Sequence, residues 1–272
     1  FTAAGAIGPA IAALVVSQAG VSAALWADAG SFAVVALLTG TAGALPLGER
    51  AQGEWRTRLR EGFAYVRERR LLFGLLVAQG VTSLFFFMVV PIEVVYAKET
   101  LHAGSSGYGW LLSAWGLGMI AGGLFVASAN RIRIQALLFA GTVAIALSYL
   151  GMAIAPSLGV ACAISFAGGV GNGLQWVSMI NAVQELTSSA MQARVMALLE
   201  AVAVALPAVG FGVGGVLTSV ASPRAAYAVA GAGGVFVVIV AVLRLGRTPW
   251  VGAGGPSSDE AVVAAGHGPK PS

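Results

Sequence analysis

The sequence contains few charged residues, one cysteine and two histidines. Only 10% of its 272 residues are Asp, Glu, Lys or Arg, whereas 58% are hydrophobic. A water-soluble domain of this size could not cover its surface with so few charged groups, so we expect a membrane protein. The single cysteine excludes an intramolecular disulfide. His102 lies in a loop and His267 in the tail, and no cluster of Cys and His residues predicts a metal site or another cofactor.

The excess of positive charge is small, with 15 Lys and Arg residues against 11 Asp and Glu residues. These charges lie between apolar runs and do not form one continuous stripe, so we expect no binding of nucleic acid.

Eight apolar runs are long enough to cross the hydrocarbon core of a bilayer, which takes roughly 20 residues each. The sequence therefore predicts an all-α, polytopic membrane helix bundle with spans at 1–16, 23–45, 71–97, 106–128, 134–155, 158–186, 194–220 and 225–245. Alternate connections carry 13 of the 15 Lys and Arg residues on one side, and only Lys98 and Arg224 lie on the other. Because cytoplasmic loops carry the excess of Lys and Arg, we expect both ends of the chain in the cytoplasm.

The connection at 46–70 is amphipathic. Trp55, Leu59, Phe63 and Val66 share one helical face, which predicts a helix on the inner membrane surface with its arginines among anionic headgroups. A solvated linker helix explains the same pattern.

Residues 246–272 have no apolar periodicity, and we expect a disordered cytoplasmic tail.

The first two predicted spans align with the last two at an offset of 202 residues without a gap. Gly8 falls on Gly210, Ser17 on Ser219 and Val35 on Val237. This offset predicts a duplicated six-helix unit, with residues 71–245 as the carboxyl-terminal half and residues 1–45 as the last two helices of the preceding half. We therefore expect an amino-terminally truncated piece of a twelve-helix protein, lacking roughly 130 residues, that does not transport by itself.

Several stretches resemble the major facilitator superfamily, and within it the drug-proton antiporter branch that includes macrolide and siderophore exporters. "GAIGPAIAAL", residues 5–14, looks like the antiporter motif of the fifth helix. "LREGFAYVRERRLLFGLL" resembles the central loop entering the seventh helix, "GYGWLLSAWGLGMIAGGL" the eighth helix, and "ARVMALLEAVAVALPAVGFGVGGVL" the eleventh. Two features depart from the family pattern: Ala12 and Ala13 replace the usual glycines, and the basic signature between helices eight and nine is reduced to "NRIR", without its acidic partner.

The resemblance implies proton-linked export by a multi-pass protein of the kind that confers multidrug resistance. The antiporter motif also has a physical reading of its own. Pro9 removes a backbone donor, and the small residues around it let a neighbouring helix approach closely: Gly5, Gly8, Ala12 and Ala13. A tightly packed helix without any coupling role remains the alternative. In the span at 194–220, Pro207 with Gly210, Gly214 and Gly215 is the expected counterpart.

Four carboxylates fall within the predicted spans, where charge is costly and therefore indicates function. Asp28, about 9 Å into its span at 1.5 Å per residue, is the first candidate for proton coupling, and Glu200 is the second. The spans offer no buried Lys or Arg as partners, so a neutral carboxyl that exchanges its proton for substrate is plausible. A structural hydrogen bond is the alternative for Asp28. Glu93 and Glu185 lie closer to the interface, and we expect solvated helix ends there.

Polar and amphipathic side chains within the spans should face the interior of the bundle. Asn172, Gln175 and Trp176 form an i, i+3, i+4 cluster on one helical face. The candidates for a substrate cavity are Gln79, Trp115, Asn172, Gln175, Trp176 and Asn181.

Two short stretches match known functional motifs, but the residues around them do not support those functions. "GSSG" at 104–107 fits an intramembrane serine protease, yet no histidine lies on a neighbouring span. "GLGMIA" at 116–121 has the spacing of a dinucleotide fingerprint but lies inside an apolar span, so we expect a packing face there and no enzyme activity.

Together these patterns predict an exporter of a small amphipathic molecule in the bacterial inner membrane, monomeric in its full-length form, with protons as the coupling ion. A non-transporting scaffold, a channel-like protein or an inactive fragment are the alternatives.

Overall fold

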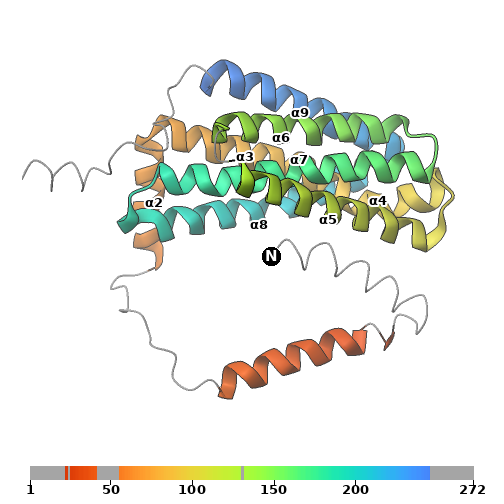
Figure 1. Cartoon of the computed structure of the whole chain (residues 1–272), viewed down its shortest axis with the longest axis horizontal. Helices are drawn as coiled ribbons and strands as arrows, with labels where there is room; N and C mark the ends of the chain where they lie inside the picture. The colour runs from red at the N-terminus through yellow and green to blue at the C-terminus, as the bar shows by residue number, and fades with distance from the viewer. Residues whose placement is uncertain (1–21, 24, 42–54, 130–131, 246–272) are drawn as a thin grey trace, which may run out of the picture.

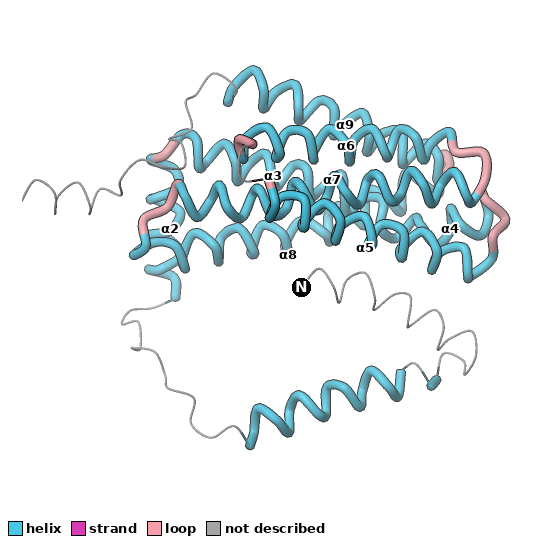
Figure 2. Tube along the Cα trace, viewed as in Figure 1, coloured by secondary structure: helices cyan, strands magenta, loops and turns pink. Residues whose placement is uncertain are grey.

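The computed structural model describes residues 22–23, 25–41, 55–129 and 132–245. Throughout these residues the chain folds into helices joined by short turns (Figures 1 and 2). The span predicted at 1–16, which includes Gly5, Gly8, Pro9, Ala12 and Ala13, lies outside the described residues, as does the tail at 246–272. The span predicted at 23–45 corresponds to the apolar helix Leu25–Thr41, whose side chains are exposed.

Long helices form a bundle in which consecutive members run in opposite directions (Figure 1). Its elements are α2 (Trp55–Glu68), α3 (Arg70–Val89), α4 (Glu93–Val95), α5 (Gly104–Ser128), α6 (Ile134–Ile154), α7 (Leu158–Glu185), α8 (Ser189–Val220) and α9 (Pro223–Leu245). Each predicted span within the described residues coincides with one helix to within a few residues. Among the described residues, five helical segments are long and apolar enough to cross a membrane: Arg70–Thr100, Ser106–Ser128, Ile134–Ile154, Ser189–Val220 and Pro223–Arg244. The predicted all-α membrane bundle is therefore confirmed.

The span that begins with α3 is continuous in space but irregular in its second half. Pro91 cannot donate a backbone hydrogen bond, and its ring crowds the carbonyl one turn earlier. At this position the helix tightens into a 3₁₀ turn, Val90–Ile92, and after α4 it widens into a π-helical turn, Tyr96–Thr100. Irregular turns of this kind inside a helix are frequent at functional sites.

The helix α7 lies between α5 and α6, and glycines make these contacts possible. A side chain at Gly118 of α5 would overlap the α7 backbone at Phe166, and one at Gly169 of α7 would overlap the α5 carbonyl of Trp115. The helix α6 meets α7 in the same way, because Gly141 lies against the backbone of Gly171. In a membrane, small residues at helix interfaces allow the close backbone contact that holds helices together. The packing face predicted at 116–121 is thus confirmed.

Side-chain bonds hold the two ends of the bundle. At one end, the Arg224 guanidinium of α9 donates to the carbonyls of Ala153 and Ala155, and the Tyr96 hydroxyl donates to the Met152 carbonyl. The helix α9 and the end of the span that begins with α3 are therefore both bonded to the end of α6. At the other end, Arg194 of α8 pairs with Glu61 of α2 at 3.0 Å.

The amphipathic helix predicted at 46–70 is present as α2, which packs against the first turns of α8. The Ser188 N–H donates to the Tyr65 hydroxyl, and Val66 is fully buried. The expected single apolar face is divided in the structure, because Leu59 and Phe63 are exposed while Val66 enters the core. This helix is therefore a packed part of the bundle.

A methyl group added at Gly169 should destabilise the bundle, because the α5 backbone occupies the space that it needs. We expect Gly169→Ala to lower the free energy of unfolding by about 1–3 kcal/mol, as overpacking typically does. The measurement is thermal unfolding in detergent. The matched control is Gly159→Ala, since nothing lies near that position on the same helix and alanine favours helix. Equal stability of the two variants would contradict the proposed role of close α5–α7 packing.

Candidate functional site

A layer of buried polar side chains lies midway along the bundle, between two apolar clusters. One cluster, around Leu72, Leu76 and Val183, fills the end nearest α2. The other, around Tyr96 and Tyr227, fills the opposite end. Buried polar groups within a span are costly unless they are paired, so a whole layer of them indicates a function.

The centre of this layer is a hydrogen bond between two buried amides. The Gln175 side-chain amide of α7 donates to the Gln79 carbonyl oxygen of α3 at 2.5 Å, and the Gln79 amide donates to the Ser83 hydroxyl at 3.2 Å. Gln79 is nine residues into α3, which is about 14 Å at 1.5 Å per residue. That depth is close to the middle of a hydrocarbon core of about 30 Å. Two residues predicted for the substrate cavity are thus brought together at the bilayer centre.

Threonine hydroxyls from two helices border the amide pair. Thr82 of α3 and Thr142 of α6 are buried and, with Gln79 and Gln175, line a small cavity of about 30 Å³. A cavity of this size can hold one water molecule. Ser178, one turn after Gln175, is fully buried, and its hydroxyl has no hydrogen-bond partner within the described part of the chain. The layer therefore has hydrogen-bonding capacity that its own side chains do not saturate.

Aromatic rings extend this region toward the opposite end of the bundle. The Trp115 ring of α5 stacks on Tyr149 of α6 with their centroids 5.9 Å apart, and Phe86 lies beside both rings. Tyr149 in turn meets Tyr227 of α9 at 5.9 Å in an edge-to-face arrangement. Trp115, the third residue predicted for the cavity, thus belongs to an aromatic cluster next to the polar layer.

The other residues predicted for the substrate cavity or for proton coupling lie outside this polar layer. Asn172 and Trp176 are half-buried on α7. Asn181 is also half-buried, but nine residues correspond to two and a half helical turns, so it lies on the opposite side of α7 from Asn172. Asp28 and Glu200, the predicted coupling residues, are both exposed on the described surface.

Sequence reasoning missed the hydroxyls that accompany Gln79. Thr82 and Ser83 follow it at i+3 and i+4, the same spacing that identified the cluster at Asn172, Gln175 and Trp176 on α7. Applying that spacing rule to α3 as well would have found them.

The position of Glu93 corrects an expectation. Its predicted place was a solvated helix end, but the span continues for two more turns, to Thr100, and Glu93 is half-buried directly after the Pro91 irregularity. The Tyr227 hydroxyl is buried and has no hydrogen-bond partner among the described residues.

Comparison with known proteins identifies the family of this arrangement. Residues 75–266, more than two thirds of the chain, match the family model described as Major Facilitator Superfamily. The chain belongs to the major facilitator superfamily. The comparison with curated proteins gave no match. As a superfamily member with apolar spans, the protein is a multi-pass membrane transporter, whose contacts are with lipid and a small-molecule substrate. Within the described ranges, no group of three or more His, Cys, Asp or Glu side chains is placed to hold a metal ion.

Breaking one side of the amide pair of this superfamily member should cost more than removing both sides. Gln175→Leu leaves the buried carbonyl oxygen of Gln79 without its donor, whereas Gln79→Leu combined with Gln175→Leu removes both amides of this bond and leaves only the Ser83 hydroxyl without its Gln79 donor. We expect a coupling energy of about 0.6–1.7 kcal/mol in a double-mutant cycle, the range found between membrane helices.

The cycle is measured by unfolding in detergent micelles. Gln184→Leu is the control, since that glutamine is exposed on the same helix. Strictly additive losses from the two single variants would contradict a direct interaction.

Proposed function

We propose that this transporter exports a small amphipathic molecule in exchange for protons, by alternating access between two six-helix halves. Family membership supports transport, and the resemblance of residues 5–14 to the antiporter motif supports coupling to protons. The bundle of α3 and α5–α9 is one such half in this proposal, and helix Leu25–Thr41 belongs to the other. The charge asymmetry of the connections supports a cytoplasmic position for both ends of the chain, in a bacterial cell in this proposal.

The observation that carries the proposal is a carboxylate inside the bundle, Glu93, at the irregular part of its span. A 3₁₀ turn at Pro91 precedes Glu93, and a π-helical turn, Tyr96–Thr100, follows it. The backbone of this segment can therefore change conformation more easily than that of a regular helix. Within the described residues no Lys or Arg forms an ion pair with Glu93. Titratable groups within a span are typical of proton relays.

The exposed carboxylates of Asp28 and Glu200 remain candidates for the same role in this proposal. Glu200 is on the outward side of α8, directly after the fully buried Leu199, and Asp28 is on the exposed helix Leu25–Thr41. Both would function where the two halves face one another. Glu93 differs from them because it is half-buried, on a span that packs against α8 and α9 and is bonded to α6 through Tyr96, all within one half.

The substrate cavity of the proposal uses the polar layer and its aromatic neighbours. Amides can recognise the polar part of an amphipathic molecule, and stacked rings can hold its apolar part. Gln79, Gln175 and Trp115 supply these groups from α3, α7 and α5, and the half-buried Asn172, Trp176 and Asn181 extend the surface along α7.

Glu93→Gln should abolish proton-driven efflux while leaving exchange of substrate between the two sides. The amide has nearly the same shape as the carboxyl but cannot take part in proton exchange. The measurement is efflux of a fluorescent amphipathic dye from cells that express the complete gene, with and without a protonophore, followed by dye counterflow in proteoliposomes at equal pH. Glu185→Gln is the matched control, because that carboxylate is exposed at the end of α7.

Asp28→Asn and Glu200→Gln are measured in the same assay, singly and combined with Glu93→Gln. Proton-driven efflux that survives neutralisation of all three carboxylates would overturn the coupling proposal. If the unmodified protein moves no dye, with or without a proton gradient, a scaffold would be favoured. If the rate of dye flux does not saturate as the dye concentration or the proton concentration is raised, a channel would be favoured.

A further inference from the structure

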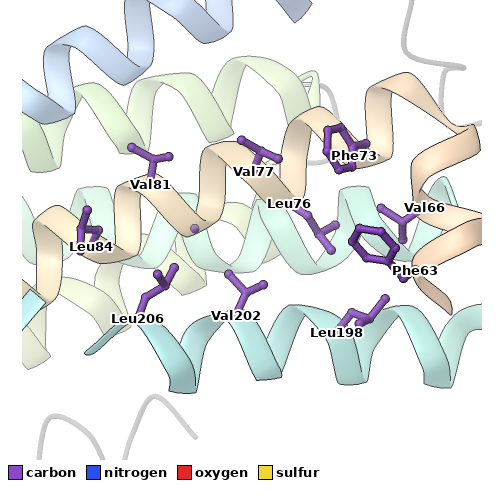
Figure 3. A pocket seen from close by; sticks show the side chains of 11 residues that line it. Phe63, Val66, Phe73, Leu76, Val77, Val81, Leu84, Leu198, Val202 and Leu206 are labelled. Carbon is purple, nitrogen blue, oxygen red and sulfur yellow. The ribbon is translucent and has the colours of Figure 1, made fainter. Parts of the chain in front are cut away.

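An apolar groove runs along the outside of the bundle between α3 and α8, and α2 closes one end of it (Figure 3). Its volume is about 330 Å³. The walls are Phe73, Val77 and Leu84 of α3 and Val202 and Leu206 of α8, while Phe63 of α2 stands at the closed end. The lining is almost entirely hydrocarbon. Phe63, Phe73 and Val77 are each at least 40% exposed, so this surface is open to whatever surrounds the bundle.

The length of the groove matches one leaflet of a bilayer. Its α3 wall extends from Phe73 to Leu84, eleven residue steps that rise about 16 Å at 1.5 Å per residue. Half of a hydrocarbon core of about 30 Å is about 15 Å. The groove is therefore about as long as one leaflet is thick, and it begins at the α2 end of the span. Its volume is at the lower end of the roughly 300–1,000 Å³ typical of ligand pockets, so it suits a narrow chain better than a bulky molecule.

Two exposed arginines that form no ion pair within the described residues lie near the α2 end of this groove. Arg67 shares a face of α2 with Phe63 at i+4, Arg70 shares a face of α3 with Phe73 at i+3, and both arginines are exposed. Of the other described cations nearby, Arg194 pairs with Glu61 and Arg69 stacks on the Tyr65 ring at 3.5 Å, while Arg60 is exposed one turn before Phe63 on α2.

The acidic side chains of α2 do not neutralise this end of the groove. Glu61 is held by Arg194. Glu68 follows Phe63 by five residues, which turns it about 140° around the helix from the groove. The result is an apolar groove about as long as one leaflet is thick, with two exposed guanidinium groups at its α2 end that form no ion pair within the described residues. That combination is complementary to a molecule with an anionic head and a hydrocarbon chain.

We propose that this groove is a binding site for one anionic phospholipid, with an acyl chain along α3 and α8 and the phosphate on Arg67 and Arg70. The site depends on the membrane location of the bundle and is independent of proton coupling or the direction of transport. A lipid bound there contacts α2, α3 and α8 together, and so couples the α2 helix to the span that carries Gln79 and Glu93.

The test measures which lipid the purified full chain retains. The protein is equilibrated in mixed micelles that contain phosphatidylglycerol and phosphatidylcholine with identical acyl chains, and bound lipid is counted by native mass spectrometry. We expect retention of one phosphatidylglycerol in preference to phosphatidylcholine. The double variant Arg67→Gln, Arg70→Gln should weaken retention about 25-fold, from about fivefold for each arginine near an anionic headgroup. Arg133→Gln is the matched control, because it removes an exposed charge at the start of α6, outside the groove.

A second pair of variants tests the apolar part. Val202→Trp fills the groove and should reduce retention of phosphatidylglycerol, whereas Val216→Trp adds the same ring at an exposed position of α8 outside the groove and should not. Free glycerol phosphate, the headgroup without a chain, should fail to displace the lipid.

Three results would overturn the proposal. They are equal retention of the two lipids, undiminished retention by the double arginine variant in monodisperse protein, and displacement of phosphatidylglycerol by glycerol phosphate at similar concentration. Failure of the unmodified chain to retain either lipid would also reject it and would indicate that another protein segment covers the groove.

Discussion

Close backbone contact between α7 and its neighbours is the constraint on which the rest of the arrangement depends. In a bilayer, burial of apolar side chains gives helices little reason to associate, because lipid tails are as apolar as leucine. Glycines on three helices remove the side chains that would keep the backbones apart, notably Gly118, Gly141 and Gly169. Contact on two sides then fixes the rotation of α7 about its axis. That rotation directs Gln175 toward Gln79 of α3.

The bonding pattern differs between the ends and the middle of the bundle. The ends are tied by charged or phenolic side chains that satisfy carbonyls or carboxylates directly, such as Arg224 on the end of α6 and Arg194 on Glu61. The middle is held by neutral amides and hydroxyls, one of which, on Ser178, has no partner among the described groups. Neutral hydrogen bonds between membrane helices contribute modestly, so the middle of the bundle can exchange partners at lower cost than the ends. A site that must bind and release a substrate benefits from this difference.

The fold could be predicted from the sequence because length and hydropathy alone determine where a chain can cross a membrane. Within the described residues, each span and the packing face at 116–121 were found in this way. The site was harder to predict. Gln79 and Gln175 were both identified as candidates, but their mutual bond depends on helix rotation, which weak hydrophobic periodicity in buried spans does not reveal. Glu93 was predicted to be solvated because the predicted span ended four residues after it, at Ala97, whereas in the structure the helical segment continues to Thr100 and Glu93 is half-buried.

The divided role of α2 shows a further limit of pattern reasoning. Its apolar spacing was compatible with a helix on the membrane surface and with a solvated linker, and hydrophobic periodicity cannot distinguish a lipid contact from a protein contact. Tyr65 and Glu61 make the difference, because their bonds to Ser188 and Arg194 require a partner helix at a specific distance. Those partners are more than 120 residues away in sequence, and only the fold brings them to α2.

The span of α3 unites these observations, because its opposite faces have different surroundings. One face carries Gln79 and Ser83 into the polar layer, and the other carries Phe73 and Val77 along the outer groove. Both faces belong to one helix, so a tilt or rotation of α3 that changes the groove must also move the amide pair. Beyond Pro91 the same span carries Glu93, and the irregular turns there can absorb such a movement locally while Tyr96 holds the end of the span to α6. One helical span therefore connects the outer groove, the polar layer and Glu93, and its irregular turns after Val89 are the place where it can bend.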